Sequence, residues 1–393
     1  MRIRSSSLYL HIPFCQRKCP YCDFNTYAGQ ERRYDAFASA LTDDIVRDGL
    51  ARGRPLVPTL FMGGGTPTVL AHEHLERIFN GIRKGFQLAP NAEISSEANP
   101  GTVDHDRFGT LRSLGVNRLS MGVQSFDGEE LQFLGRIHSG REAIQAFELA
   151  RKVGFENINL DFMFGLPGQK PRTWVQTLRQ AIELGPEHIS LYSLTVEPDT
   201  PLAAWVARGQ VSEPDPDLAA DLYELACEHL SDAGYHQYEI SNWARGPIGE
   251  DGLPRFACQH NLVYWRNGVY LGFGPGAHSS DAGQRWSILG AVDAYIQAIA
   301  ANASPLDFQE DIPRALEMGE TMMLGLRLVE VGVDRSAFRQ RFGKDVSQVY
   351  PDELERLQAT GLLEITAQRV RLTPQAKLLG NEVFAAFLPE IEE

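Results

Sequence analysis

Three cysteines lie close together near the start of the chain, at Cys15, Cys19 and Cys22. Three residues separate the first pair and two separate the second pair. Thiolates with this spacing on a short loop can bind three irons of one 4Fe-4S cluster, so that the fourth iron is open to a ligand that the protein does not supply. The spacing therefore predicts an iron-sulfur centre whose open iron is the place of the chemistry.

Two other interpretations of the three cysteines stay open on spacing alone. A structural zinc site needs four protein ligands and would have to recruit His11 or a distant cysteine. Cysteines of a packed core would be the simplest case, but prolines and charged residues such as Arg17 and Lys18 stand between these three. Such residues are rarely buried completely. The spacing favours the cluster over both alternatives.

A second group of residues has the chemistry to bind a small ligand. A glycine triplet at 63–65 lets the main chain approach a ligand closely, so Gly64 and Gly65 could present backbone groups to it. Glu97 and Asp161 could bind hydroxyl groups or an ammonium, and Arg136 could pair with a carboxylate through its planar fork. Taken singly, each of these polar residues is more often a surface charge or a hydrogen-bond partner at a strand end.

The elements that would position these residues follow a regular alternation through the first half of the chain. Short apolar or β-branched runs alternate with stretches whose apolar residues recur at three- and four-residue intervals, which is typical of parallel βα units. Six strands are too few for an eight-fold barrel, so the pattern predicts an α/β fold with an open, partial (β/α)6 barrel. The runs expected as strands are 7–12, 59–62, 93–96, 118–123, 157–163 and 188–194, and the stretches expected as helices are 31–50, 72–86, 104–114, 139–153 and 171–184.

The candidate ligand-binding residues fall at matching positions of these units. The cysteine loop follows the first expected strand, the glycine triplet follows the second, and Glu97, Gln124 and Asp161 come at the ends of the third, fourth and fifth. The carboxyl ends of barrel strands form the face on which such barrels place their active sites. Their shared position therefore predicts one common site.

The rest of the chain divides into two further regions. We expect the barrel over residues 1–235, an aromatic-rich connecting region over 236–304, and a smaller domain over 305–393. The last region has helices, then an alternating segment typical of a hairpin, then a helix, which is a winged-helix-like α+β order. Residues 301–393 contain 10 Lys and Arg against 16 Asp and Glu. This charge indicates a packing or partner domain and not a DNA-binding one.

The composition limits the classes of protein to consider. The 393 residues are 43% hydrophobic, which is enough for a substantial core. The formal net charge of -14 makes nucleic acid an unlikely partner. Three of the five cysteines lie in one loop, which is not the spread of a disulfide framework and indicates a reducing cytoplasm. With no apolar run of about 18 residues, we expect a cytoplasmic protein without a transmembrane segment.

Taken together, these residues resemble the radical S-adenosylmethionine (SAM) family, of which the three-cysteine loop is the hallmark. The segments 9–15, 63–68, 121–126 and 161–168 are similar to the branch that contains oxygen-independent coproporphyrinogen III oxidase. The resemblance implies that the three cysteines hold a 4Fe-4S cluster and that SAM binds its open iron. It also implies a set of residues around SAM, namely Tyr9, Tyr21, Gly64, Gly65, Thr66, Glu97, Gln124, Arg136 and Asp161.

Within this branch, the chain differs from the oxidase. Phe24 stands where the oxidase has one more cysteine, and the long extension before the cysteine loop is missing. The segment 260–265 reads His-Asn-Leu-Val-Tyr-Trp and is similar to the HNxxYW motif of the HemW-type haem chaperones, which share the Cys-Asp-Phe ending of the loop. A neutral imidazole can ligate haem iron, while Tyr264 and Trp265 offer flat apolar surface to the macrocycle.

The resemblance thus implies a haem chaperone with His260 as a haem ligand, which transfers haem to acceptor haemoproteins. The alternative is an oxygen-independent coproporphyrinogen III dehydrogenase or a related radical SAM enzyme that acts on a tetrapyrrole. Whether the chain is an enzyme that cleaves SAM stays open at this point. A homodimer is compatible with the sequence, although no spacing requires it.

Overall fold

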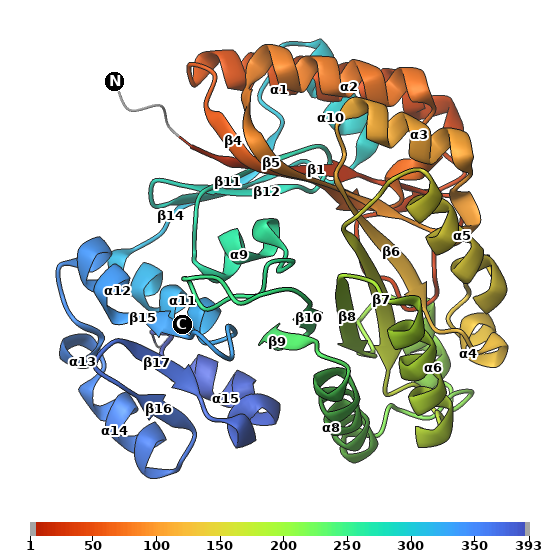
Figure 1. Ribbon diagram of the computed structural model, residues 1–393. Helices are drawn as coiled ribbons and strands as arrows, with labels where there is room; N and C mark the ends of the chain where they lie inside the picture. Colours follow the sequence, from red (N-terminus) through yellow and green to blue (C-terminus); the bar gives the residue numbers. More distant parts are fainter. Residues whose placement is uncertain (1–4, 390–393) are drawn as a thin grey trace.

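The fold is built on one large curved sheet (Figure 1). The computed structural model describes residues 5–389. Within these residues the main sheet has 12 strands in the order β14-β13-β12-β11-β1-β4-β5-β6-β7-β8-β10-β9. Six neighbouring strands at its centre run parallel to one another. They are β1 (Ser7–Ile12), β4 (Leu56–Gly64), β5 (Gln87–Ala98), β6 (Arg118–Gln124), β7 (Ile158–Phe164) and β8 (His188–Ser193).

Helices cover the outer face of the six parallel strands (Figure 1). Their sequences carry the expected start signals: Asp104 accepts a hydrogen bond from the Arg107 N–H, Ser139 and Glu142 form a capping box, and Pro171 opens the next helix. The helices are α1 (Tyr34–Ala51), α2 (His72–Gly85), α3 (His105–Leu114), α4 (Gly128–Phe133), α5 (Gly140–Lys152), α6 (Pro171–Leu184) and α8 (Pro216–Asp232). All six expected strands and all five expected helices are present, which confirms the open, partial (β/α)6 barrel.

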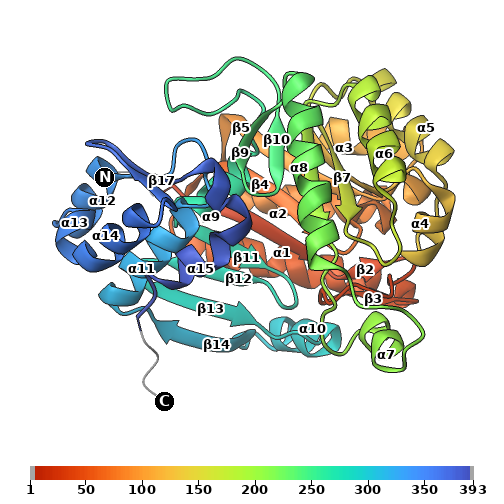
Figure 2. The same ribbon diagram turned by 90° about the horizontal axis from the view of Figure 1, so that it is seen from below.

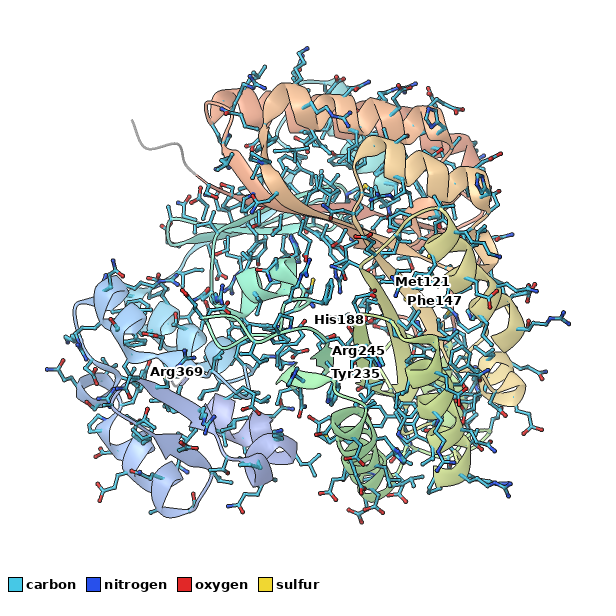
Figure 3. All side chains as sticks on the ribbon, in the orientation of Figure 1. Met121, Phe147, His188, Tyr235, Arg245 and Arg369 are labelled. Carbon is cyan, nitrogen blue, oxygen red and sulfur yellow. The ribbon has the colours of Figure 1, made fainter. Side chains whose placement is uncertain are left out.

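Alternation along the strands separates the core from the inner face of the barrel. On β6, Leu119, Met121 and Val123 belong to the core between sheet and helices, whereas Arg118 and Ser120 lie on the opposite face. Met121 lies beside Phe147 of α5 in this core layer, and His188 of β8 lies on the inner face (Figure 3). The inner face is therefore polar and free to form a site.

The connecting region and β14, which follows it, extend the sheet on both sides. β11 (Tyr270–Phe273) pairs parallel with β1, followed by the antiparallel strands β12 (His278–Asp281), β13 (Gln284–Ile288) and β14 (Leu306–Asp311). At the other side, β10 (Asn242–Ala244) and β9 (His236–Glu239) follow β8. The helix α10 (Val292–Ala300) packs on α1, and α7 (Pro201–Ala207) lies at the edge of the molecule (Figure 2). The helix α9 (Gln259–Trp265) occupies the concave side of the sheet, against β4 and α11 (Arg314–Gly325) (Figure 1).

The C-terminal region forms a second core beside the barrel (Figure 2). Its elements have the expected winged-helix-like order, with helices before a hairpin whose three-stranded sheet has the order β15-β17-β16. They are α11 (Arg314–Gly325), β15 (Val333–Asp334), α12 (Arg335–Phe342), α13 (Val346–Val349), α14 (Pro351–Ala359), β16 (Leu363–Ile365), β17 (Arg369–Leu372) and α15 (Gly380–Ala385). The boundaries expected at 235 and 304 stay predictions. None of the helices in residues 5–389 has the length and apolarity that a membrane crossing needs.

Candidate functional site

A cavity of about 580 Å³ lies on the inner face of the barrel. Its lining comes from the carboxyl ends of the parallel strands, from the cysteine loop and from α9. Every residue that the sequence singled out for a cluster, SAM or haem lies in this lining except Trp265, although the ligand that each of them binds stays a prediction. They are Tyr9, Cys15, Cys19, Tyr21, Cys22, Gly64, Gly65, Thr66, Glu97, Gln124, Arg136, Asp161 and His260.

The cysteine loop is closed at its base by a short parallel pair, β2 (Phe14–Cys15) with β3 (Tyr27–Ala28). The three thiols are free and partly exposed. Thr66 Oγ1 donates to Cys15 Sγ at 3.7 Å, and Arg136 Nη1 donates to Cys19 Sγ at 3.4 Å. Burial raises the pKa of the Cys15 and Cys22 thiols. The sulfur of Cys19 has a charged hydrogen-bond donor, the Arg136 guanidinium.

These three thiols match the donor set of a cluster with one open iron. They come from one short loop that borders one cavity, and hydroxyl or guanidinium donors reach two of the sulfurs. Between residues 5 and 389, no three His, Cys, Asp or Glu side chains are already gathered around a metal position. The loop therefore supplies the right ligands in one place. In this conformation the three sulfurs do not yet surround one metal position.

The glycine triplet joins the end of β4 to the cysteine loop. Gly65 N–H donates to the Ile12 carbonyl at 2.8 Å, and Thr66 N–H donates to the Phe14 carbonyl at 2.7 Å. Gly64 has a φ of +96°, and a Cβ at Gly65 would lie 2.5 Å from the Phe14 oxygen. Only glycine allows such a close approach of two backbones. The triplet thus sets the position of the cysteine loop over the strand ends.

Two half-buried carboxyl groups line the cavity near the ends of β5 and β7. Glu97 accepts a hydrogen bond from the Gly64 N–H at 3.1 Å, and Asp161 accepts from Ser120 Oγ at 3.1 Å and Asn159 Nδ2 at 2.8 Å. Burial and, to a lesser extent, the Asp161 carboxylate raise the pKa of Glu97 to about 8. Burial also raises the pKa of Asp161. A cationic ligand would relieve both effects, so this pair is suited to a sulfonium or ammonium.

Two further residues shape the mouth of the cavity. Gln124 has a φ of +72°, in the left-handed region that non-glycine residues rarely adopt. Such strain persists where the surrounding structure holds a residue in a required position, as at binding sites. Arg136 donates to the Gly122 carbonyl at 2.6 Å as well as to Cys19, so it connects the end of β6 to the cysteine loop.

His260 lies at the floor of the cavity and is only 1% exposed. Its Nδ1 is 2.9 Å from Thr59 Oγ1, and its Nε2 is 3.0 Å from the Tyr264 hydroxyl. Burial lowers the pKa of His260 to about 3, with a further contribution from the positive charge of Arg118. The imidazole is therefore neutral, as a metal ligand must be, but both ring nitrogens have partners in this conformation.

The other motif residues are divided between the cavity and the packing behind it. Tyr264 lines the cavity, whereas Trp265 lies under the guanidinium of Arg327, with 4.5 Å between the two centres. Cys258 is fully buried, with its Sγ 3.6 Å from Glu93 Oε1. Glu93 also accepts the N–H groups of Gln259 and His260, which holds the start of α9 against β5.

Sequence reasoning missed several residues of the lining. They are polar or aromatic residues of the strands that line the cavity. The period-two alternation of β6, which places Arg118 and Ser120 on the face of Gln124, was the signal that could have found two of them. The missed residues include Phe61, Arg118, Ser120, Asn159, Ser190 and Tyr192.

Known proteins are similar in sequence to this chain over almost its whole length. Residues 9–181 match the Radical SAM superfamily and residues 303–379 match the HemN C-terminal domain. The chain is 39% identical to the haem chaperone HemW of Bacillus subtilis, over 98% of this chain and 100% of that protein. The chain belongs to the HemW family of radical SAM proteins. HemW of Escherichia coli is 40% identical over 98% of both chains.

A solved structure also has this fold. Coproporphyrinogen III oxidase (HemN) from Escherichia coli, a radical SAM enzyme, superposes with a TM-score of 0.83 and 25% sequence identity, over 98% of this chain and 90% of that one. Membership of the radical SAM superfamily implies a 4Fe-4S cluster and SAM as cofactors. The cavity of this HemW family member offers the thiols and the acidic pair that such cofactors need.

Proposed function

We propose that this protein is a haem chaperone that binds haem, a 4Fe-4S cluster and SAM and transfers haem to acceptor haemoproteins. The observation that carries the proposal is that the HNxxYW helix and the cysteine loop border one cavity. Identity over almost full length to proteins named haem chaperones supports it. The net charge of -14 argues against nucleic acid as a partner.

In this proposal the mouth of the cavity holds the cofactors. Cys15, Cys19 and Cys22 bind the cluster, and Arg136 steadies the loop beside Cys19. A bound cluster supplies one-electron reduction. Glu97 and Asp161 face the positive charge of SAM, while Gly64 leaves room for the cofactor at the end of β4. The remaining proposed contacts are Tyr9, Tyr21, Gly65, Thr66 and Gln124.

His260 is the proposed haem ligand at the floor. Ligation through Nε2 requires the Tyr264 hydroxyl to turn away, because this nitrogen is now hydrogen-bonded to that hydroxyl. Thr59 can keep the ring oriented through Nδ1 meanwhile, as the partners of metal-bound histidines do. Delivery then requires an acceptor that binds haem more tightly than this protein does in the docked complex. We place the protein in the cytoplasm, where its five free thiols would stay reduced.

The test is an anaerobic titration of the cluster-reconstituted protein with haem, followed by Soret absorption. We expect saturable binding of about one haem per chain, and at least tenfold weaker binding in His260→Ala, because loss of a metal ligand typically costs that much or more. His278→Ala is the matched control, since His278 is exposed and outside the cavity lining. Unchanged affinity and spectrum in His260→Ala would disprove the ligand assignment.

A radical SAM enzyme that acts on a tetrapyrrole is the second candidate, and the TM-score of 0.83 with HemN favours it. It predicts that coproporphyrinogen III loses two carboxyl groups while 5′-deoxyadenosine accumulates. An anaerobic assay of the reconstituted protein with SAM and a reductant decides between the two. Stoichiometric conversion would overturn the chaperone proposal, whereas absence of turnover together with haem binding would support it.

A further inference from the structure

Arg118 is a buried cation at the floor of the cavity, and its guanidinium has no partner among the residues that the structure describes. It is the first residue of β6, is 2% exposed and lines the cavity. Its Nε is buried without a hydrogen-bond partner, and no hydrogen bond or ion pair among residues 5–389 engages its guanidinium. A buried charge is costly unless a partner compensates it. The guanidinium therefore has unused donors where the cavity reaches it.

The nearby carboxylates do not satisfy this guanidinium. Glu93 and Asp161 are the two carboxyl groups among the acidic groups whose charges act on Arg118. The oxygens of Glu93 accept the N–H groups of Gln259 and His260, and those of Asp161 accept from Ser120 and Asn159. Both carboxylates are thus engaged elsewhere and form no ion pair with Arg118. They partly neutralise its charge and leave its fork of donors free.

The position of Arg118 separates it from the cofactor end of the cavity. Arg118 precedes Gly122 by four residues, and Gly122 is where Arg136 and the cysteine loop meet β6. A strand rises about 3.3 Å per residue, so the two positions are about 13 Å apart along β6. The carboxylate of a SAM molecule whose amino-acid end lies at the cysteine loop would therefore not be the partner of Arg118. A different anion is required.

We propose that Arg118 is the carboxylate-binding residue of the cavity floor and that it takes a propionate of haem. The inference rests on the proposed function. A guanidinium binds a carboxylate through two parallel hydrogen bonds, and haem carries two propionates. Arg118 lies close enough to His260 for its charge to act on the imidazole. One ligand could therefore meet both residues, with its iron at the imidazole and a carboxylate at the guanidinium.

The test compares haem with haem dimethyl ester, whose propionates carry no charge. Both are titrated anaerobically into the cluster-reconstituted wild type, Arg118→Gln and Arg118→Lys. We expect the wild type to bind haem at least tenfold more tightly than the ester, since a hydrogen-bonded charge pair contributes roughly that factor or more. Arg118→Gln should bind haem about as weakly as the ester, and Arg118→Lys should keep part of the preference.

Each result has one meaning. Equal affinity of the wild type for haem and ester, or a preference that survives in Arg118→Gln, overturns the inference and leaves the haem-binding function intact. Binding of neither ligand by the wild type overturns the proposed function itself. Circular dichroism and the cluster absorption of each variant check that it folds. If Arg118→Gln does not fold, the comparison of haem with ester in Arg118→Lys decides, because a weaker but retained preference is expected there.

Discussion

The residues of the cavity fall into two groups of opposite character. Near the strand ends, Glu97 and Asp161 form an acidic pair beside the cysteine loop. At the floor, the lining consists of the cationic Arg118 and the neutral His260. The floor group is buried and the acidic pair is half-buried, so each depends on a ligand or on its neighbours to compensate its polarity. This division suits a cationic cofactor at the mouth and an anionic ligand at the floor.

The acidic pair predicts a pH dependence of SAM binding. Burial and Asp161 raise the pKa of Glu97 to about 8, so at neutral pH most of this carboxyl group is protonated before SAM binds. A cation favours the charged form, so we expect affinity for SAM to increase as the pH rises through 8 and to decrease below it. Anaerobic calorimetry between about pH 6.5 and 9 measures this.

The matched variants for this prediction are Glu97→Gln and Glu156→Gln. The first should bind SAM about tenfold more weakly and lose the pH dependence, because a neutral amide does not titrate in this range. Glu156 is exposed and outside the cavity lining, so its variant should behave like the wild type. A wild-type affinity that is constant across the range would contradict the assigned role of Glu97.

His260 gives the opposite expectation, a haem complex that is insensitive to pH. Burial and Arg118 lower the pKa of His260 to about 3, so the ring is neutral and can ligate iron throughout the usual range. An exposed histidine would be protonated below about pH 6.5 and would lose its iron there. We expect the Soret band of the haem complex to stay unchanged from about pH 8 down to pH 5. Loss of the band with a midpoint near 6.5 would show that an exposed histidine is the ligand.

At the scale of elements, the sequence was most informative where the chain forms buried parallel strands and amphipathic helices. β1 and α6 have the predicted boundaries, because an apolar run and a 3.6-residue period mark them clearly. The strands β11–β13 were not predicted, since they are short and do not show a continuous apolar run. The presence of Arg118 and His260 in one cavity could not be predicted either. It depends on α9 reaching the barrel floor from a distant part of the sequence.

The turn after β4 gives a prediction at this scale. A Cβ at Gly65 would lie within 2.8 Å of three backbone atoms of Ile12 and Phe14, so Gly65→Ala must displace the cysteine loop. We expect a loss of about 1–3 kcal/mol in the free energy of unfolding and a lower iron content after reconstitution. Denaturant unfolding and iron analysis measure the two effects.

Gly109→Ala is the control for this turn. Gly109 lies in α3, and nothing stands within 4 Å of an added Cβ there. Alanine is the better helix former by up to about 1 kcal/mol, so this variant should be neutral or slightly stabilised and should keep its iron. If Gly65→Ala behaves like Gly109→Ala, the close approach of the two backbones does not position the cysteine loop.

At the scale of the whole molecule, Arg327 joins the C-terminal region to two separate elements of the connecting region. It follows α11 of the C-terminal region, stacks on Trp265 of α9 at 4.5 Å, and pairs with Glu239 of β9 at 3.8 Å. Glu239 is 0% exposed, and one of its oxygens has no hydrogen-bond partner within residues 5–389. The tryptophan of the HNxxYW motif thus contacts the C-terminal region, while the histidine of the same helix faces the cavity.

This arrangement predicts that Arg327→Met destabilises the protein and weakens haem binding together. Removing the guanidinium leaves the Glu239 carboxylate buried without a cation, which typically costs about 3–5 kcal/mol. It also removes the contact that holds Trp265, so α9 and His260 should be less well fixed. Denaturant unfolding and the haem titration measure both effects on the same samples.

The added change Glu239→Gln separates the two consequences of losing Arg327. The double variant no longer buries an unpaired charge, so we expect it to recover most of the stability. It still lacks the contact with Trp265, so its haem affinity should stay low if α9 is positioned through that contact. Arg172→Met, at an exposed position of α6, serves as the control. Recovery of haem affinity together with stability would show that Arg327 acts on the fold alone and not on the position of His260.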